Sequence, residues 1–281
     1  AADLSNLSPG VYSLTATDTN GCSIAQTYTL SQPDAISISG VISNYNGFGV
    51  SAKNASNGSI NATVVGGYLD NGSNYVYSWT GPNGFTSNNE DISNLSAGTY
   101  NLTVTDDNDC TKTIQFVITE PDLLVASGVP SNYNGFEISC NGANDGFVIL
   151  TVSGGATDYT YSWTGPNGYS SNQKDISNLT PGTYNVTITD ANGNKVELEF
   201  EIVEPNILQL SANLSNFNGF NVSCFSGNNG SIDLTMSGGT SNYTYSWTGP
   251  NGFTSSAADI NNLIAGEYQV IVNDSNGCTI T

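Results

Sequence analysis

The chain has 281 residues and a formal net charge of −20, because 24 acidic side chains face only 4 lysines and there is no arginine or histidine. This charge excludes binding to nucleic acid through phosphate neutralisation and makes an anionic membrane surface an unfavourable partner. Without histidine, Ser-His-Asp triads and histidine-ligated metals are excluded too. No apolar run is long enough to span a membrane. The abundance of Asn, Ser, Thr and Gly suits an extracellular β protein.

One stretch, Tyr-x-Tyr-Ser-Trp-Thr-Gly-Pro-Asn-Gly, occurs three times, at 75–84, 159–168 and 243–252. The copies lie 84 residues apart, a period that indicates an array of whole domains rather than a solenoid of short repeats. The aromatic residues alternate as on one face of a β-strand, and Gly-Pro-Asn-Gly is a turn sequence. The stretch therefore predicts a half-buried core strand followed by a tight turn.

A second motif, Leu-x-x-Gly-x-Tyr, ends at Tyr12, Tyr100, Tyr184 and Tyr268. Its first interval is 88 residues, because the loop after the first Gly-Gly pair carries four extra residues. Aligning both motifs divides the chain into modules. The predicted limits are the C-terminal part of one module at 1–33, complete modules at 34–121 and 122–205, and a module lacking its last strand at 206–281.

Within 122–205, apolar alternation between turn signals predicts seven short strands. They cover residues 123–129 continued by 136–140, 147–153, 159–164, a short stretch from 169, 175–179, 184–189 and 196–203. No helical periodicity occurs, so we expect an antiparallel β-sandwich. A tryptophan on the third strand and a Leu-x-x-Gly-x-Tyr before the sixth, typical of a tyrosine corner, narrow this to an immunoglobulin-like sandwich.

Each predicted module boundary carries one proline, at Pro33, Pro121 and Pro205, without a Gly/Ser-rich spacer. Such connections are short and stiff. The predicted fold class is therefore all-β: a tandem array of immunoglobulin-like antiparallel β-sandwich modules forming an extended rod. The chain begins inside a module and lacks a signal peptide at its start, so we expect an internal piece of a longer secreted polypeptide.

Short motifs follow one another in a fixed order: Cys-Asn-Gly-Ala-Asn-Asp-Gly at 140–146, Gly-Gly at 154–155, Tyr-x-Tyr-Ser-Trp at 159–163, Leu-x-x-Gly-Thr-Tyr at 179–184, Thr-Asp-Ala-Asn-Gly at 189–193 and Glu-Pro at 204–205. As a set they resemble SprB-type repeats, which occur in very large surface adhesins of Bacteroidetes-type bacteria similar to the gliding-motility adhesin. The resemblance covers essentially the whole chain.

The resemblance implies export by the type IX secretion route and display at the cell surface, attached to the outer membrane through parts of the protein outside this chain. The implied partners are external surfaces or polysaccharide and the gliding and secretion machinery of the cell envelope, with no membrane insertion by this segment. The chain departs from the family at two cysteine positions, occupied by Ala52 and Asn194. This departure puts a fixed disulfide within each module in doubt.

The five cysteines are Cys22, Cys110, Cys140, Cys224 and Cys278. A complete module has two cysteine positions, one at the end of the first strand and one at the start of the last. The predicted strand directions place these positions about 25 Å apart at opposite ends of one module, too far for a disulfide. The first position of one module would instead meet the second position of the next.

That scheme pairs Ala52 with Asn194, both lacking cysteine, and Cys140 with Cys278, both present. We therefore expect a Cys140–Cys278 bond between modules, leaving the other three cysteines with partners outside the chain. A bond within one module, Cys224–Cys278, and free thiols stay open as alternatives.

No catalytic residue is predicted. The visible carboxylate groups are Asp106-Asp107 in a turn and Glu197, Glu199 and Glu201 on the outward face of a last strand. Outward charges on an edge strand protect it from aggregation. We therefore expect a protein that is not an enzyme.

Calcium is the one cofactor for which the sequence offers candidate ligands. Asp106, Asp190 and Asp274 each lie in the turn before a last strand and are weak candidates for Ca²⁺ at module junctions. The alternative is a hairpin turn that uses Asp and Asn for their backbone geometry. One recurring carboxylate per turn is too few for a tight site, so no bound cofactor is the main expectation.

Two functions fit the repeats. In the first, the modules form a non-catalytic shaft of a surface adhesin that supports attachment and gliding. In the alternative, each module is itself a carbohydrate- or surface-binding domain, which needs solvent-facing aromatic side chains. Most recurrent aromatics take inward positions, and Phe85, Tyr169 and Phe253 just after the turns are the least certain. The shaft is therefore favoured.

Overall fold

The structure, a computed structural model, describes residues 3–281. The chain consists of antiparallel β-strands and turns, and it divides into two compact units, Ala1–Asp122 and Leu123–Thr281. The helical elements of the described residues are three single 3₁₀ turns: Pro82–Gly84, Pro166–Gly168 and Pro250–Gly252. None of the helices in this part of the chain is long and apolar enough to cross a membrane.

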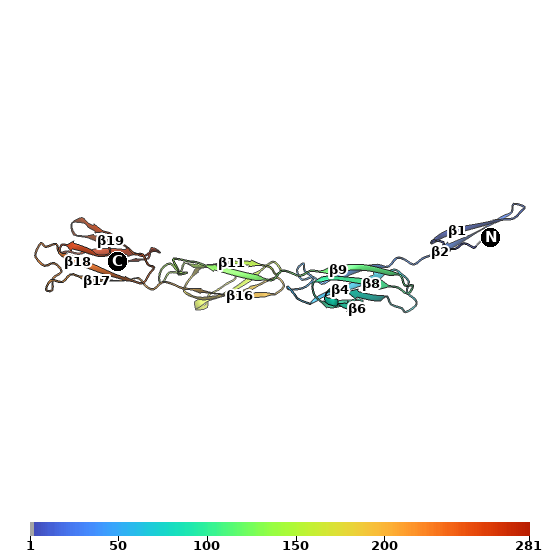
Figure 1. The fold of residues 1–281 in the computed structure, drawn as a ribbon, viewed down its shortest axis with the longest axis horizontal. Coiled ribbons are helices and arrows are strands. Elements are labelled where there is room, and N and C mark those ends of the chain that lie inside the picture. The colour runs from blue at the N-terminus through green and yellow to red at the C-terminus, as the bar shows by residue number, and fades with distance from the viewer. Residues whose placement is uncertain (1–2) are drawn as a thin grey trace. The chain divides into compact units, whose positions relative to one another are not determined.

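The first unit contains a hairpin and one sandwich (Figure 1). The hairpin pairs β1 (Gly10–Thr17) with β2 (Ser23–Leu30). The first sandwich has a three-stranded and a four-stranded sheet. In spatial order, the three-stranded sheet contains β3 (Ser37–Ile42), β4 (Gly58–Val65) and β7 (Ile92–Leu95). The four-stranded sheet contains β6 (Thr86–Ser87), β5 (Val76–Thr80), β8 (Gly98–Thr105) and β9 (Thr111–Ile118).

The second unit contains two further sandwiches with sheets of the same size. The second sandwich contains β10 (Val125–Pro130), β11 (Gly146–Ser153) and β14 (Ile176–Leu179), and β13 (Ser170–Ser171), β12 (Thr160–Thr164), β15 (Gly182–Thr189) and β16 (Lys195–Ile202). The third contains β17 (Gln209–Leu214), β18 (Gly230–Ser237) and β21 (Ile260–Leu263), and β20 (Phe253–Ser255), β19 (Thr244–Gly249), β22 (Gln269–Asn273) and β23 (Thr279–Ile280).

All three sandwiches share one strand order. The first, second and fifth strands form one sheet, and the fourth, third, sixth and seventh form the other. This is an immunoglobulin-like arrangement in which the short fourth strand pairs with the third. The predicted all-β, immunoglobulin-like class is confirmed. The module limits stay predictions, and their boundaries fall in the loops before β3, β10 and β17.

Each sandwich has its own core with a tryptophan at its centre. Trp79, Trp163 and Trp247 are 1%, 1% and 3% exposed. The indole N–H of Trp163 donates to the backbone carbonyl of Gln173 at 2.9 Å. Because an unpaired buried N–H is costly, this bond lets the ring lie among apolar side chains. The aromatic face of the repeated stretch is a core face.

The predicted tyrosine corners are present at the start of the sixth strands. The hydroxyl of Tyr184 donates to the carbonyl of Thr180, four residues upstream, at 3.0 Å, and Tyr100 does the same to Ser96. The ring of Tyr184 covers Gly165 so closely that a Cβ there would lie 2.6 Å from it. Glycine before the turn proline is thus a packing requirement.

The prediction of a strand at 136–140 is wrong. The backbone N–H groups of Glu137 and Ile138 both donate at 3.1 Å to the carbonyl of Val203, just after the last strand, and no ladder forms. Ile138 is fully buried and closes this end of the sandwich. The alternation of Phe136 and Ile138 imitates a strand, because one apolar side chain of a loop is anchored in the core.

The third sandwich has only two paired residues in its seventh strand. β23 pairs with β22 at Ile280 and Thr279, whereas β16 pairs with β15 along eight residues. An open groove of about 1160 Å³ lies beside Trp247 and Tyr268.

Candidate functional site

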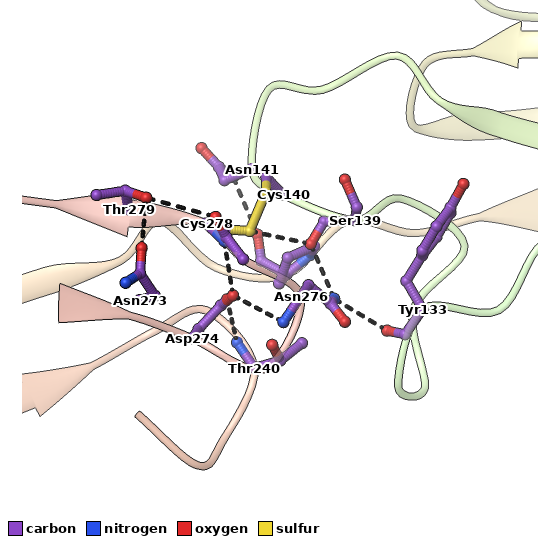
Figure 2. Close-up of a disulfide and its surroundings, with 12 residues drawn as sticks. Tyr133, Ser139, Cys140, Asn141, Thr240, Asn273, Asp274, Asn276, Cys278 and Thr279 are labelled. Atoms are coloured by element: carbon purple, nitrogen blue, oxygen red, sulfur yellow. Dashed lines mark hydrogen bonds between the residues drawn. A yellow bond between two sulfur atoms is a disulfide. The ribbon is translucent and has the colours of Figure 1, made fainter. Parts of the chain in front are cut away.

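A disulfide bond joins the second sandwich to the third (Figure 2). Cys140 and Cys278, 138 residues apart in the sequence, have Cα atoms 5.7 Å apart. This is the pair expected from the matching of cysteine positions. The alternative bond within one module, Cys224–Cys278, is not formed. Cys22, Cys110 and Cys224 are exposed thiols.

The cysteine of the second sandwich follows a loop that is shaped by its own hydrogen bonds. The side chain of Asn132 accepts the N–H of Gly135 at 2.8 Å, and the carboxylate of Asp145 accepts the N–H of Ser139 at 3.1 Å. Gly135 has a φ of 100°, a conformation that costs glycine little. The loop before Cys140 is therefore held in place without a regular strand.

The cysteine of the third sandwich ends a tight turn built on Asp274. One carboxylate oxygen accepts the N–H groups of Asn276 and Cys278, both at 2.9 Å, and the other accepts the N–H of Thr240 at 2.8 Å. The side chain of Asp274 is 5% exposed. A buried carboxylate with three N–H donors fixes the direction in which Asn276 and Cys278 leave the turn.

Asn276 links this turn to the loop of the second sandwich (Figure 2). Its side-chain amide donates to the carbonyls of Tyr133 at 3.2 Å and Ser139 at 2.9 Å. Its carbonyl oxygen accepts the side-chain amide of Asn134 at 2.6 Å. The disulfide thus lies beside a set of three hydrogen bonds that position the same two segments.

The connection between these sandwiches is held by a further contact. Glu204, in the Glu-Pro sequence after β16, accepts the N–H of Gly142 at 2.6 Å. In the first sandwich Glu120 likewise accepts the N–H of Asn54 at 2.7 Å and pairs with the ammonium of Lys53. A surface ion pair of this kind contributes little to stability, so the shared feature is the backbone contact.

The three weak calcium candidates, Asp106, Asp190 and Asp274, occupy equivalent buried positions. Asp190 accepts the backbone N–H of Ala156 at 3.0 Å and, from Asn194, the backbone and side-chain N–H groups at 2.8 and 2.9 Å. Oxygens that face N–H donors are poorly placed to ligate a cation. No group of three potential ligands occurs in the described part of the chain. The geometry favours the hairpin-turn interpretation.

The same hydrogen bonds shift the pKa values of these carboxyls. Burial alone would raise the pKa of Asp190, but the bonds from Asn194 and Ala156 outweigh it and lower the pKa. For Asp106 the largest effect is the backbone bond from Tyr68, which lowers the pKa. The carboxylates therefore stay charged and keep their turns closed at neutral pH.

The least certain aromatics after the turns also belong to the cores. Phe85, Tyr169 and Phe253 are half-buried. Tyr169 packs edge-on against Tyr184 with ring centroids 5.2 Å apart, and the equivalent pairs lie 5.3 Å apart. These positions do not form an exposed aromatic platform.

Two parts of the junction were not predicted from the sequence. These are the hydrogen bonds of Asn276 and the contact of Glu204 with Gly142. The signal that could have found them is recurrence, since Asn repeats in the turn of every module and Glu precedes two of the three junction prolines.

The fold and this junction define a tandem array of immunoglobulin-like sandwiches in which the second and third are cross-linked. The SprB repeat family model matches residues 137–168 and 220–252. Two stretches of the chain therefore match the SprB repeat, in agreement with the resemblance of its motifs. Each match runs from the loop before the cysteine to the Gly-Pro-Asn-Gly turn. No curated protein matches this chain.

Several solved structures align with the chain at low identity. The three N-terminal domains of the highly immunogenic outer capsid protein of bacteriophage RB49 have a TM-score of 0.43 and 17% identity, with 80% of each chain covered. A tetra-tandem repeat from the extending region of a large adhesion protein has a TM-score of 0.30 and 16% identity, with 99% of this chain and 81% of that chain covered. A Ca²⁺-stabilised adhesin with which an Antarctic bacterium binds ice has a TM-score of 0.35 and 14% identity, with 96% of this chain and 79% of that chain covered. Values this low carry no functional conclusion.

Proposed function

We propose that this chain is a repetitive, load-bearing stretch of a large cell-surface adhesin and catalyses no reaction. The adhesin class rests on the SprB repeats. Gliding motility, export by the type IX route, and attachment to the outer membrane and to the gliding machinery through other parts of the protein belong to the same proposal. The adhesive ligand would be bound outside these sandwiches.

The observation that carries the proposal is the junction between the second and third sandwiches. A covalent bond, the hydrogen bonds of Asn276 and the contact of Glu204 with Gly142 all act on one short connection. A protein that only displayed independent binding domains would have no need to fix them to one another. A shaft needs this fixation, because bending at each joint would shorten its reach.

The burial of the aromatic residues supports the shaft over the glycan-binding alternative. Binding sugars by stacking needs exposed rings at equivalent positions in every module. Trp79, Trp163 and Trp247 are instead buried and hydrogen-bonded. The chain also offers very few cationic side chains for acidic polysaccharide.

The test has two arms on the purified chain. Small-angle scattering compares the wild type with the Cys140→Ser/Cys278→Ser double variant, and we expect the variant to broaden the pair-distance distribution. Biolayer interferometry with immobilised neutral and acidic polysaccharides is expected to show no saturable binding. Identical scattering of both proteins together with saturable binding would overturn the shaft in favour of modules that bind glycans themselves.

A further inference from the structure

The dipeptide Asn-Gly occurs thirteen times in the part of the chain that the structure describes. Asparagine is a chemically labile residue, and it is most labile before glycine, which has no side chain to hinder attack by its backbone nitrogen on the asparagine side chain. The attack needs a glycine N–H outside any hydrogen bond and an asparagine side chain that can turn towards it. The hydrogen bonds of the fold therefore decide which pairs can react.

In seven pairs an acceptor holds the glycine N–H. That of Gly277 donates to the carbonyl of Asp274 at 3.1 Å, and that of Gly142 donates to the carboxylate of Glu204 at 2.6 Å. The other glycines bonded in this way are Gly21, Gly47, Gly135, Gly193 and Gly219. A nitrogen whose proton is held in this way can attack only after the local structure opens.

In two further pairs both ends of the asparagine side chain are held. The oxygen of Asn57 accepts the N–H of Ser51 at 3.1 Å, and its nitrogen donates to the hydroxyl of the same serine at 2.9 Å. Asn229 makes the same two bonds with Ser223. These side chains cannot turn towards the following glycine without losing both bonds.

The three Pro-Asn-Gly turns are closed by backbone bonds. In the first, the N–H of Gly81 donates to Phe85 and that of Phe85 donates to Pro82, both at 3.0 Å. The aromatic residue after each turn is packed against the tyrosine of the corner. The asparagines of these turns are therefore restrained by their surroundings, and we expect them to react slowly. They are Asn83, Asn167 and Asn251.

The remaining pair, Asn71-Gly72, lies in the longer loop of the first sandwich. The N–H of Ser73 donates to the carbonyl of Asp70 at 2.9 Å, so Asn71 and Gly72 are the central residues of a β-turn. This bond leaves the N–H of Gly72 without an acceptor in the described part of the chain, and the side chain of Asn71 has no hydrogen bond there either. Both residues are exposed.

We propose that Asn71 is a site of spontaneous deamidation, at which the folded chain converts its own asparagine into aspartate and isoaspartate while the other Asn-Gly pairs are preserved. The inference goes beyond the proposed function, because the reaction needs only the chain and water.

The reaction has two steps. The backbone nitrogen of Gly72 attacks the side-chain carbonyl carbon of Asn71, its proton passes to the departing amide nitrogen, and ammonia leaves as a succinimide ring closes. Water then opens the ring at either carbonyl, which gives aspartate or isoaspartate. One water is consumed and one ammonia is released, so neither an oxidant nor a cofactor takes part.

The position of the reactive pair limits the damage to a surface loop. Asp107 accepts the N–H of Asp70 at 2.6 Å, so the product adds a carboxylate beside two others in this loop. The same reaction at Asn276 would replace the amide that donates to Tyr133 and Ser139 by a carboxylate facing two carbonyls. The bond from Gly277 therefore protects the junction chemically as well as shaping its turn.

The test incubates the purified full chain, with its disulfide intact, in mildly alkaline buffer made with water enriched in heavy oxygen. Digestion with pepsin at acid pH stops the reaction, and tandem mass spectrometry assigns the label to single residues. We expect label at position 71 first, at least about tenfold faster than at the turn asparagines, because their restraint costs the energy of a hydrogen bond or more. No label is expected at Asn276.

A second arm uses the reduced chain unfolded in urea. There all thirteen pairs should react at comparable rates, because each has glycine after asparagine and no fold restrains it. A lead of Asn71 that is as large in urea as in the folded chain would show that the local sequence, and not the hydrogen bonds, selects the site.

Three variants complete the test, and far-UV circular dichroism checks that each is folded. Gly72→Ala should slow the reaction of Asn71 about tenfold or more, whereas the matched Gly84→Ala should leave it unchanged; a Cβ at either glycine meets no atom within 4 Å. Asn216→Ala removes the acceptor of the N–H of Gly219 and should make Asn218 reactive. The proposal is overturned if another pair of the folded chain reacts as fast as Asn71, or if Asn218 stays unreactive in Asn216→Ala.

Discussion

The second and third sandwiches have the same strand order but differ in the seventh strand. In the second, Phe200 of β16 lies against Trp163 with ring centroids 5.9 Å apart, and Ile202 is 1% exposed. In the third, the sequence covers only Thr279–Ile280 of β23, and a groove lies beside Trp247. The two sandwiches therefore show what the last strand contributes: an aromatic cover over the core tryptophan and a seal at the end of the sheet.

The opposite sheet has adapted to this cover. A Cβ on Gly128 of β10 would lie 2.4 Å from the ring of Phe200 and 2.8 Å from Leu150. The equivalent residue of β17 is Ala212, which borders the open groove. A glycine is thus needed where a phenylalanine packs over it.

The largest expected effect comes from the core tryptophans. Trp163→Ala should destabilise the second sandwich by about 3–5 kcal/mol, since it leaves a cavity under Phe200. Trp247→Ala should cost the third sandwich less, about 2–3 kcal/mol, because its surroundings are already open on one side. Hydrogen exchange of peptides from each sandwich in increasing urea measures both values. Equal losses would mean that the last strand does not determine the packing around the indole.

The disulfide links the two sandwiches and is the next largest contribution. Cys278→Ser should lower the stability of the second unit by about 2–4 kcal/mol, since the bond closes a long loop in the unfolded chain. Cys224→Ser removes an exposed, unpaired thiol from the same sandwich and is expected to change stability by less than about 0.5 kcal/mol. Urea unfolding followed by hydrogen exchange compares them, and a loss shared by both variants would contradict this account.

The adaptation of the opposite sheet gives a smaller effect. Gly128→Ala should destabilise the second sandwich by about 1–3 kcal/mol, because the new methyl group collides with Phe200. Ala212→Gly in the third sandwich should cost no more than about 1 kcal/mol. The same exchange experiment applies. If Gly128→Ala were neutral, Phe200 would have to move without losing its contact with Trp163.

The smallest expected difference concerns pH. Burial opposes ionisation of Asp190 and Asp274, but hydrogen bonds outweigh it and lower both pKa values in the folded protein. The stability they contribute is therefore present above the unfolded pKa of about 3.9 and is lost as pH falls through the folded pKa. When urea unfolding is measured at decreasing pH from 6 downward, the urea concentration at the midpoint should begin to decrease at about pH 4. Asp190→Asn should flatten this fall in the second sandwich but leave it in the third.

The fold could be predicted because local pattern and tertiary structure agree. Alternating apolar residues in β11 and β15, the tyrosine corner of Tyr184 and the buried Trp163 all follow from spacing in the sequence. The segment 136–140 could not be predicted correctly. Its backbone donors bond to Val203, and nothing local signals a partner so far along the chain.

The candidate site was predictable in part. The pairing of Cys140 with Cys278 follows from strand directions and from the matched absence of cysteine elsewhere. The hydrogen bonds of Asn276 do not follow in this way, because asparagine is abundant throughout the chain and this abundance hides the residue whose amide bonds to the neighbouring module. A polar contact between modules becomes visible only when both loops are placed in space.

The Cys140–Cys278 bond also determines which part of the chain can lengthen under tension. The covalent path of a pull applied at β10 and at Thr281 runs from Cys140 directly to Cys278, so it bypasses the 138-residue segment between them. At roughly 3.5 Å per residue, reduction of this one bond would add about 480 Å to the length that the chain can reach. With the bond intact, only the pairing of β10 with β11 and of β23 with β22 can yield to such a pull, and the other strands are loaded only after the sulfur–sulfur bond has been broken.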